Sequence, residues 1–199
     1  IFFNGFYHGV SPMVQKIDYP GVTPEDVANN LYTPWDDIEN FKRLLAENEG
    51  EIAAVIAQPY NHGNFNDNSF PIDGFWKEVR ELCTKNEIVL IVDDVRCGFR
   101  LDLAGSDHFF GFEADIICFC KALANGWNVS CLCGKDFLKS AMSGLSYTGS
   151  YWMSAVPFAA GIACIEKMKK LDTPAMFKKL GTQLTNGLKA AAANNGFDL

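Results

Sequence analysis

An aspartate and a lysine each follow a hydrophobic run, and together they suggest a chemistry. Residues 88–92 are five hydrophobic residues, four of them β-branched, and this run ends at Asp93. A second run, at 115–120, starts with an aspartate and ends at Lys121. Hydrophobic runs of this kind are typical of strands buried on both faces of a parallel sheet. Because ligands of open α/β sheets bind at the carboxyl ends of the strands, we expect Asp93 and Lys121 to lie at the same edge.

This pair fits one cofactor chemistry. A lysine held in mostly apolar surroundings can lose its proton and form a Schiff base with an aldehyde. A carboxylate beside a pyridine nitrogen keeps that nitrogen protonated, which makes the ring an electron sink. Both features belong to enzymes that use pyridoxal phosphate. Spacing alone, however, favours a surface lysine after one strand and an aspartate in a turn after the other.

Longer patterns around both residues carry a resemblance to a known family. Residues 90–100 read L-I-V-D-D-V-R-C-G-F-R and resemble the D-E-V-x-T-G-F-R segment of class III (fold type I) aminotransferases. Residues 114–126 resemble their P-D-I-x-x-x-x-K-x-x-x-G-G segment, in which the lysine carries the cofactor. Residues 7–9 match their Y-H-G turn. The motifs occur in the family's order over nearly the whole chain, and within the family the sequence most resembles glutamate-1-semialdehyde aminomutases.

The resemblance implies a function for each matched residue. Lys121 would hold pyridoxal phosphate as a Schiff base, and Asp93 would pair with the pyridine nitrogen. Tyr7 and Val95 would cover opposite faces of the ring. His8 would belong to the same cofactor-binding turn, where we expect it to hydrogen-bond locally. The implied reaction moves an amino group between two molecules or, in an aminomutase, within one small amino-carbonyl substrate; the alternative is a catalytically inactive relative that acts as a dimerising or regulatory module.

A later turn resembles the family's phosphate-binding segment. Residues 147–152 resemble the T-G-T-Y/F turn, which in the family's homodimer reaches the cofactor phosphate of the partner subunit. The resemblance therefore implies a homodimer with its active site at the subunit interface, and Ser150 and Thr148 as phosphate donors. Small hydroxyls near the start of a helix are good donors to phosphate. An ordinary helix-capping turn would explain these residues equally well.

Two further positions concern the substrate. Gln58 stands where most relatives have a glutamate before a proline, and this departure weakens any assignment of a subtype. The polar segment 61–69 occupies the place of the family's substrate-facing loop. We expect its histidine, His62, to be exposed to solvent.

The pattern of elements predicts a three-layer α/β/α fold with a mostly parallel sheet. Strands are predicted at 1–4, 52–57, 88–92, 115–120 and 129–132, and helices at 36–48, 71–86, 136–142, 157–171 and 174–195. Residues 10–34 are predicted to be a long loop with one short helix. By the resemblance, 1–165 would be a cofactor-binding large domain that is incomplete at its amino-terminal side. Residues 166–199 would lead toward a missing small domain, so that the chain is a central fragment.

Composition narrows the class of partner. The chain has 199 residues, 48% of them hydrophobic, and a net charge of −7, which disfavours nucleic acid and anionic membrane surfaces. No hydrophobic run approaches the length of a membrane span. The seven cysteines are odd in number and fit a reducing, cytoplasmic compartment. Their C-x-C spacing differs from that of common zinc sites, so no metal site is predicted.

Overall fold

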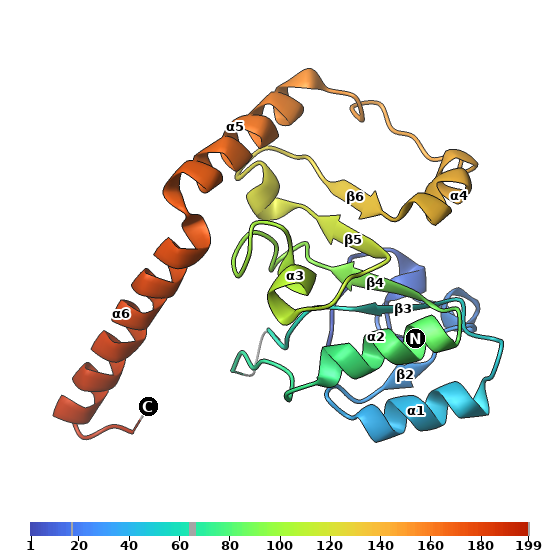
Figure 1. Ribbon diagram of the computed structural model, residues 1–199, viewed down its shortest axis with the longest axis horizontal. Helices are drawn as coiled ribbons and strands as arrows, with labels where there is room; N and C mark the ends of the chain where they lie inside the picture. The colour runs from blue at the N-terminus through green and yellow to red at the C-terminus, as the bar shows by residue number, and fades with distance from the viewer. Residues whose placement is uncertain (17, 64–66, 199) are drawn as a thin grey trace.

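The computed structural model describes residues 1–16, 18–63 and 67–198, and a six-stranded sheet lies at the centre of this part of the chain (Figure 1). The strand order is β2-β1-β3-β4-β5-β6. Neighbouring strands from β2 to β5 are parallel, and β6 is antiparallel to β5. The strands are β1 (Phe2–Phe3), β2 (Tyr32–Thr33), β3 (Ala54–Ala57), β4 (Val89–Asp93), β5 (Ile116–Phe119) and β6 (Cys131–Gly134). The predicted α/β fold with a mostly parallel sheet is confirmed.

Two amphipathic helices build the main core against this sheet. Helices α1 (Ile38–Glu47) and α2 (Phe75–Lys85) lie side by side across one face of it (Figure 1). Each buries one stripe of hydrophobic residues, as the helical period of its sequence predicts. The cluster that results is rich in aromatic residues and includes Phe3, Phe41, Val55, Phe75, Trp76, Val79 and Leu90.

The remaining helices follow the later half of the chain. Short 3-10 helices occur at Pro12–Val14, Pro24–Val27, Lys121–Leu123 and Asp136–Leu138. Two short α-helices are α3 (Ser106–Phe110) and α4 (Lys139–Ser143), and two long ones are α5 (Ala155–Leu171) and α6 (Thr173–Asn194). A second, smaller cluster joins α5 to the end of β5 through Phe99, Phe119, Leu123 and Met168.

Several predicted bounds differ from the structure; β3, for example, begins at Ala54 rather than at 52. Strand β2 lies inside the predicted loop 10–34, because two residues are too few to show a period. Helix α2 begins at Phe75 rather than at 71, after Gly74 adopts a left-handed backbone with φ of 85°. Strand β6 begins at Cys131, two residues later than predicted.

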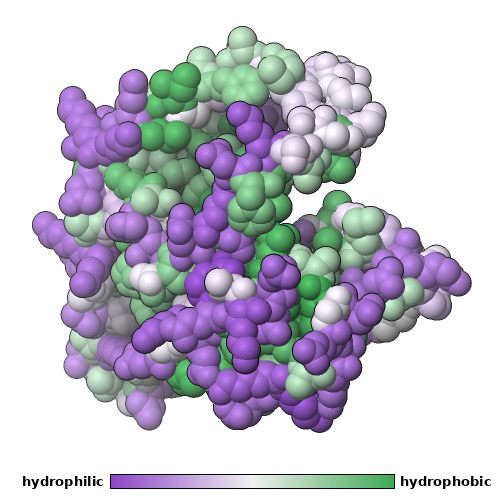
Figure 2. Space-filling view, turned by 45° about the vertical axis from the view of Figure 1, so that its right-hand side comes forward, coloured by the Kyte–Doolittle hydropathy of each residue, from purple (hydrophilic) through white to green (hydrophobic). Residues whose placement is uncertain are grey.

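Helix α6 projects away from the rest of the molecule (Figure 1). Of its residues only Thr173 is buried, whereas Phe177, Leu180, Leu184 and Leu188 are exposed. Hydrophobic residues also gather in the hollow on the face shown in Figure 2.

The predicted division after residue 165 falls inside the continuous helix α5, and a small domain beyond α6 stays a prediction. In the described ranges, no helix has both the length and the hydrophobicity needed to cross a bilayer.

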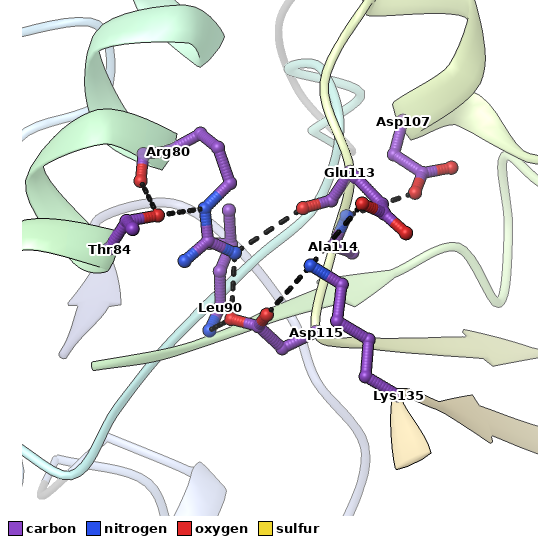
Figure 3. A network of polar contacts seen from close by, with 8 residues as sticks. All are labelled: Arg80, Thr84, Leu90, Asp107, Glu113, Ala114, Asp115 and Lys135. Carbon is purple, nitrogen blue, oxygen red and sulfur yellow. Dashed lines mark hydrogen bonds and ion pairs between the residues drawn. The ribbon is translucent and has the colours of Figure 1, made fainter. Parts of the chain in front are cut away.

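One buried carboxylate connects α2, β4, β5 and β6 (Figure 3). Asp115 Oδ2 accepts hydrogen bonds from Arg80 Nη1 at 2.7 Å and from Leu90 N at 2.8 Å. Its Oδ1 lies 3.2 Å from Lys135 Nζ, just beyond β6. Burial by itself would raise the pKa of Asp115, but the bonds from Leu90, Arg80 and Lys135 outweigh it and hold this pKa below its usual value.

We predict that Asp115→Ala lowers the free energy of unfolding at pH 7 by about 3 kcal/mol, because two cations lose a buried partner. Because the pKa of Asp115 is lowered in the folded state, its contribution is present above the ordinary carboxyl pKa and is lost as the pH falls through the folded value. Urea titrations of wild type and variant should therefore show a smaller difference in the free energy of unfolding at pH 3 than at pH 7.

The matched control is Glu113→Ala. Glu113 pairs with the same lysine, Lys135, at 3.4 Å, but its side chain is 79% exposed. We expect this change to cost less than about 1 kcal/mol, as surface ion pairs do. Equal losses for the two variants would contradict a special role for Asp115.

Candidate functional site

A cavity of about 570 Å³ opens at the carboxyl ends of β3, β4 and β5. Four segments line it: the turn after β1, the residues that follow β3, the end of β4 with the turn after it, and Lys121, the second residue after β5. Asp93 pairs with Cys118 in the parallel register of β4 and β5, and Lys121 follows three residues later. Asp93 and Lys121 therefore line the same cavity, together with Tyr7, His8 and Val95.

Asp93 is held in place by contacts from two sides. It is 8% exposed, and its Oδ2 lies 2.7 Å from His8 Nδ1. Its Oδ1 accepts the main-chain N–H of Val95 at 3.2 Å. An ionised carboxylate can only accept, so the proton of the histidine bond lies on Nδ1. The sequence analysis expected His8 to hydrogen-bond within its own turn. That expectation was wrong, because His8 bonds to Asp93 at the end of β4.

Gln58 holds the turn that carries Tyr7 and His8. Its buried amide donates from Nε2 to the main-chain oxygen of Tyr7 at 2.8 Å. An ionised glutamate at this position has no hydrogen to donate to a carbonyl. The departure from the family pattern at Gln58 therefore has a structural consequence, because the amide links the end of β3 to the turn at 5–9.

Lys121 starts a 3-10 helix one residue beyond β5, after Cys120. Its φ of 40° is uncommon for a residue with a side chain, and strain of this kind clusters at functional sites. Helix α5 holds this segment in place by two contacts. Leu123 packs in one hydrophobic cluster with Met168, and Cys164 Sγ lies 3.3 Å from the main-chain oxygen of Ala122. Lys121 itself is exposed, whereas the sequence predicted mostly apolar surroundings.

Two residues that sequence reasoning missed also line the cavity, His62 and Arg96. His62 was expected in solvent but is only 5% exposed, because the ring of Tyr60 packs against it edge-on and Arg96 ties it inward. Burial, and then the charge of Arg96, lower the pKa of His62. Residues 64–66 of the predicted loop lie outside the described part of the chain.

The predicted phosphate donors lie elsewhere. Thr148 and Ser150 are exposed in the segment between α4 and α5, and neither lines the cavity. Their expected contact was to a partner subunit's cofactor. Their role stays a prediction.

The cavity residues suit pyridoxal phosphate by their chemistry. A primary amine at Lys121 and an anchored carboxylate at Asp93 are the two groups that the cofactor's aldehyde and ring nitrogen require. The ring of Tyr7, 54% exposed at the cavity, offers a flat surface for a second flat ring. The Asp93 carboxylate retains acceptor capacity beyond its two present bonds.

The second aspartate of the pair points into the protein. Asp94 is 1% exposed and accepts two hydrogen bonds from Ser106 at the start of α3, from N at 2.9 Å and from Oγ at 2.6 Å. A Cβ at Gly98 would lie 2.7 Å from the main-chain oxygen of Asp94 and equally close to the ring of Phe119, so only glycine fits there. Burial raises the pKa of Asp94 to about 6.

Comparisons with known proteins show which family the chain is similar to. The model of the aminotransferase class-III family matches residues 4–197. The aminopentol aminotransferase of Sphingopyxis macrogoltabida is 32% identical over 98% of this chain and 46% of that protein. The glutamate-1-semialdehyde 2,1-aminomutase of Alkaliphilus oremlandii is 32% identical over 96% of this chain and 48% of that protein. This chain therefore spans about half the length of the curated relatives that it matches.

A solved structure shows the same fold. The FumI protein of Sphingopyxis sp. MTA144, in its pyridoxal phosphate internal aldimine form, superposes with a TM-score of 0.93. It is 31% identical, and the match covers 98% of this chain and 47% of that one. An aminotransferase and an aminomutase are matched at equal identity, so the comparisons identify the family and leave the reaction open.

The raised pKa of Asp94 generates a prediction about stability. Its folded value of about 6 exceeds its ordinary 3.8, so this group's contribution to stability is fully present below pH 3.8 and is lost as the pH rises through 6. Between pH 4.5 and 7.5 the wild type should lose about 2 kcal/mol relative to Asp94→Asn. Urea unfolding of both proteins at the two pH values measures this, and parallel pH profiles would contradict it.

Proposed function

Because the chain belongs to the class-III aminotransferase family, we propose that its cavity performs pyridoxal phosphate-dependent transfer of an amino group. Lys121 would hold the cofactor, and Asp93 would partner its ring nitrogen. The observation that carries the proposal is that Asp93 and Lys121, at the ends of neighbouring parallel strands, line one cavity. His8 and the main-chain N–H of Val95 hold the carboxylate there.

Each residue would have a distinct task. The bound cofactor supplies an aldehyde that captures amines and a ring that withdraws electrons. Lys121 Nζ would also act as general base and acid, removing a proton from the substrate carbon and giving it back. Asp93 would keep the ring nitrogen protonated, and His8 would hold the Asp93 carboxylate in position through their hydrogen bond. Tyr7 and Val95 would exclude water from the two ring faces.

Further parts of the proposal concern the assembled enzyme. Its substrate would be a small amino or carbonyl compound, and the transfer would run between two molecules or, as in an aminomutase, within one. The active protein would be a cytoplasmic homodimer in which Thr148 and Ser150 contact the partner's cofactor phosphate. These parts rest on the family resemblance.

The decisive experiment identifies the lysine that binds the cofactor. The protein mixed with pyridoxal phosphate should turn yellow, and borohydride should abolish the colour and leave a pyridoxyl group that peptide mapping places on Lys121. Lys121→Ala should show no such adduct and no turnover, because no amine remains at that position. Lys77→Ala, which removes an exposed lysine on α2, should behave like the wild type.

Two outcomes would end the proposal. A fully active Lys121→Ala protein would exclude the lysine mechanism. A folded wild type that binds no cofactor would favour an inactive relative that serves as a dimerising or regulatory module. Assay with a separate amine donor and keto acceptor, and then with glutamate-1-semialdehyde alone, separates transfer between molecules from transfer within one.

The bond between His8 and Asp93 generates a second prediction. His8→Ala should weaken pyridoxal phosphate binding about tenfold, because Asp93 loses a charge-assisted hydrogen bond that orients it. His8→Gln retains an N–H donor and should recover part of this affinity. Kd values from absorbance titration test both. Equal affinity of His8→Ala and wild type would show that the histidine has no positioning role.

A further inference from the structure

Arg96 brings an uncompensated positive charge to the wall of the cavity. Arg96 lines the cavity and is exposed, and it belongs to the turn that follows Asp93. Within the described ranges it takes part in no ion pair, although Arg80 of the same chain is paired with Asp115. The guanidinium is therefore a charge that the described protein leaves unmatched at its candidate active site.

His62 holds this guanidinium in one orientation. Arg96 Nη1 donates to the main-chain oxygen of His62 at 2.6 Å and lies 3.0 Å from Nδ1 of its ring. Arginine can only donate, so Nδ1 is the acceptor in that contact. Both contacts use one terminal nitrogen of Arg96, and among described residues its other N–H groups have no acceptor. A guanidinium fixed at one end keeps the donor geometry that binds a carboxylate.

The carboxylate that lines the same cavity is already engaged. Asp93 is the cavity's only carboxylate among the described lining residues, and it bonds to His8 and to the N–H of Val95. Under the function proposed above, Asp93 also serves the cofactor's ring nitrogen. Among the described lining residues no other carboxylate is present, so the Arg96 guanidinium is available to an anionic ligand that enters the cavity.

We propose that Arg96 binds a carboxylate of the amino substrate and thereby selects amino acids over simple amines. Arg96 is the specificity-determining residue, and His62 positions it. The substrate class rests on the proposed amino-transfer function, whereas the anion site itself does not. The family motif has no fixed residue at this position, so the assignment comes from the cavity geometry and not from the motif.

A binding experiment tests the anion site without turnover. Calorimetry measures Kd for succinate and for its neutral diamide, succinamide, with wild type, Arg96→Gln and Arg43→Gln. Arg43 lies on α1, outside the cavity lining, and its replacement changes the net charge equally. Arg96→Gln should weaken succinate binding tenfold or more, roughly the cost of a lost charged hydrogen bond, and leave succinamide unchanged. Arg43→Gln should match the wild type in both.

A paired substrate assay tests the selectivity. We expect Arg96→Gln to lower kcat/KM for 4-aminobutyrate by about 10-fold to 100-fold and to change that for butylamine less than about twofold. The Kd of pyridoxal phosphate should not change. A rise in that Kd, or an equal loss for both amines, would overturn the proposal and place Arg96 at the cofactor.

The two proposals fail in different ways. Succinate binding that does not depend on Arg96 would overturn the anion site even in an active enzyme. Succinate binding that depends on Arg96, in a protein that forms no cofactor adduct, would retain the anion site and reject amino transfer.

Discussion

The register between β4 and β5 is the constraint on which the site depends, and Asp115 fixes it. Its carboxylate bonds to the N–H of Leu90 in β4, to Arg80 on α2 and to Lys135 after β6. With the start of β5 set against β4, the parallel ladder places Asp93 beside Cys118 at the far end. A shift of one residue would turn Asp93 to the other face of the sheet and move Lys121 along the edge.

The site is built from segments that are distant in the sequence and are joined to one another by hydrogen bonds. His8 bonds to Asp93, Gln58 bonds to the turn that carries His8, and Arg96 bonds to His62. The result is a carboxylate held rigidly inside a cavity that also presents exposed cationic side chains. Asp94 belongs to the supporting structure, because it points away from the cavity and ties the loop after β4 to α3. The two adjacent aspartates therefore have different roles, because the side chains of successive residues in an extended chain point to opposite sides.

Sequence reasoning succeeded where a strong local pattern was present. The hydrophobic runs at 88–92 and 115–120 correspond to β4 and β5, and the residues that follow them, Asp93 and Lys121, share the cavity as expected. It failed for β2, which has two residues, and for His62, whose burial depends on Tyr60 and Arg96. Arg96 itself occupies a variable position of the motif. The only sequence signal that could have identified Arg96 as a site residue was its positive charge, three positions after Asp93 at the end of a predicted strand.

The sequence alone determined the α/β class, strands β4 and β5, the family and the placement of Asp93 and Lys121 at one edge of the sheet, because periodicity and motif spacing are local properties of the chain. Only the tertiary structure showed that His8 reaches Asp93 across 85 positions, that Gln58 secures the turn of Tyr7, and that Arg96 lines the cavity with no ion pair to any described residue. These contacts depend on which strand ends are brought together and on which donors find an acceptor there. Neither is encoded in the spacing of the residues themselves, since both follow from the order and register of strands that are distant in the chain.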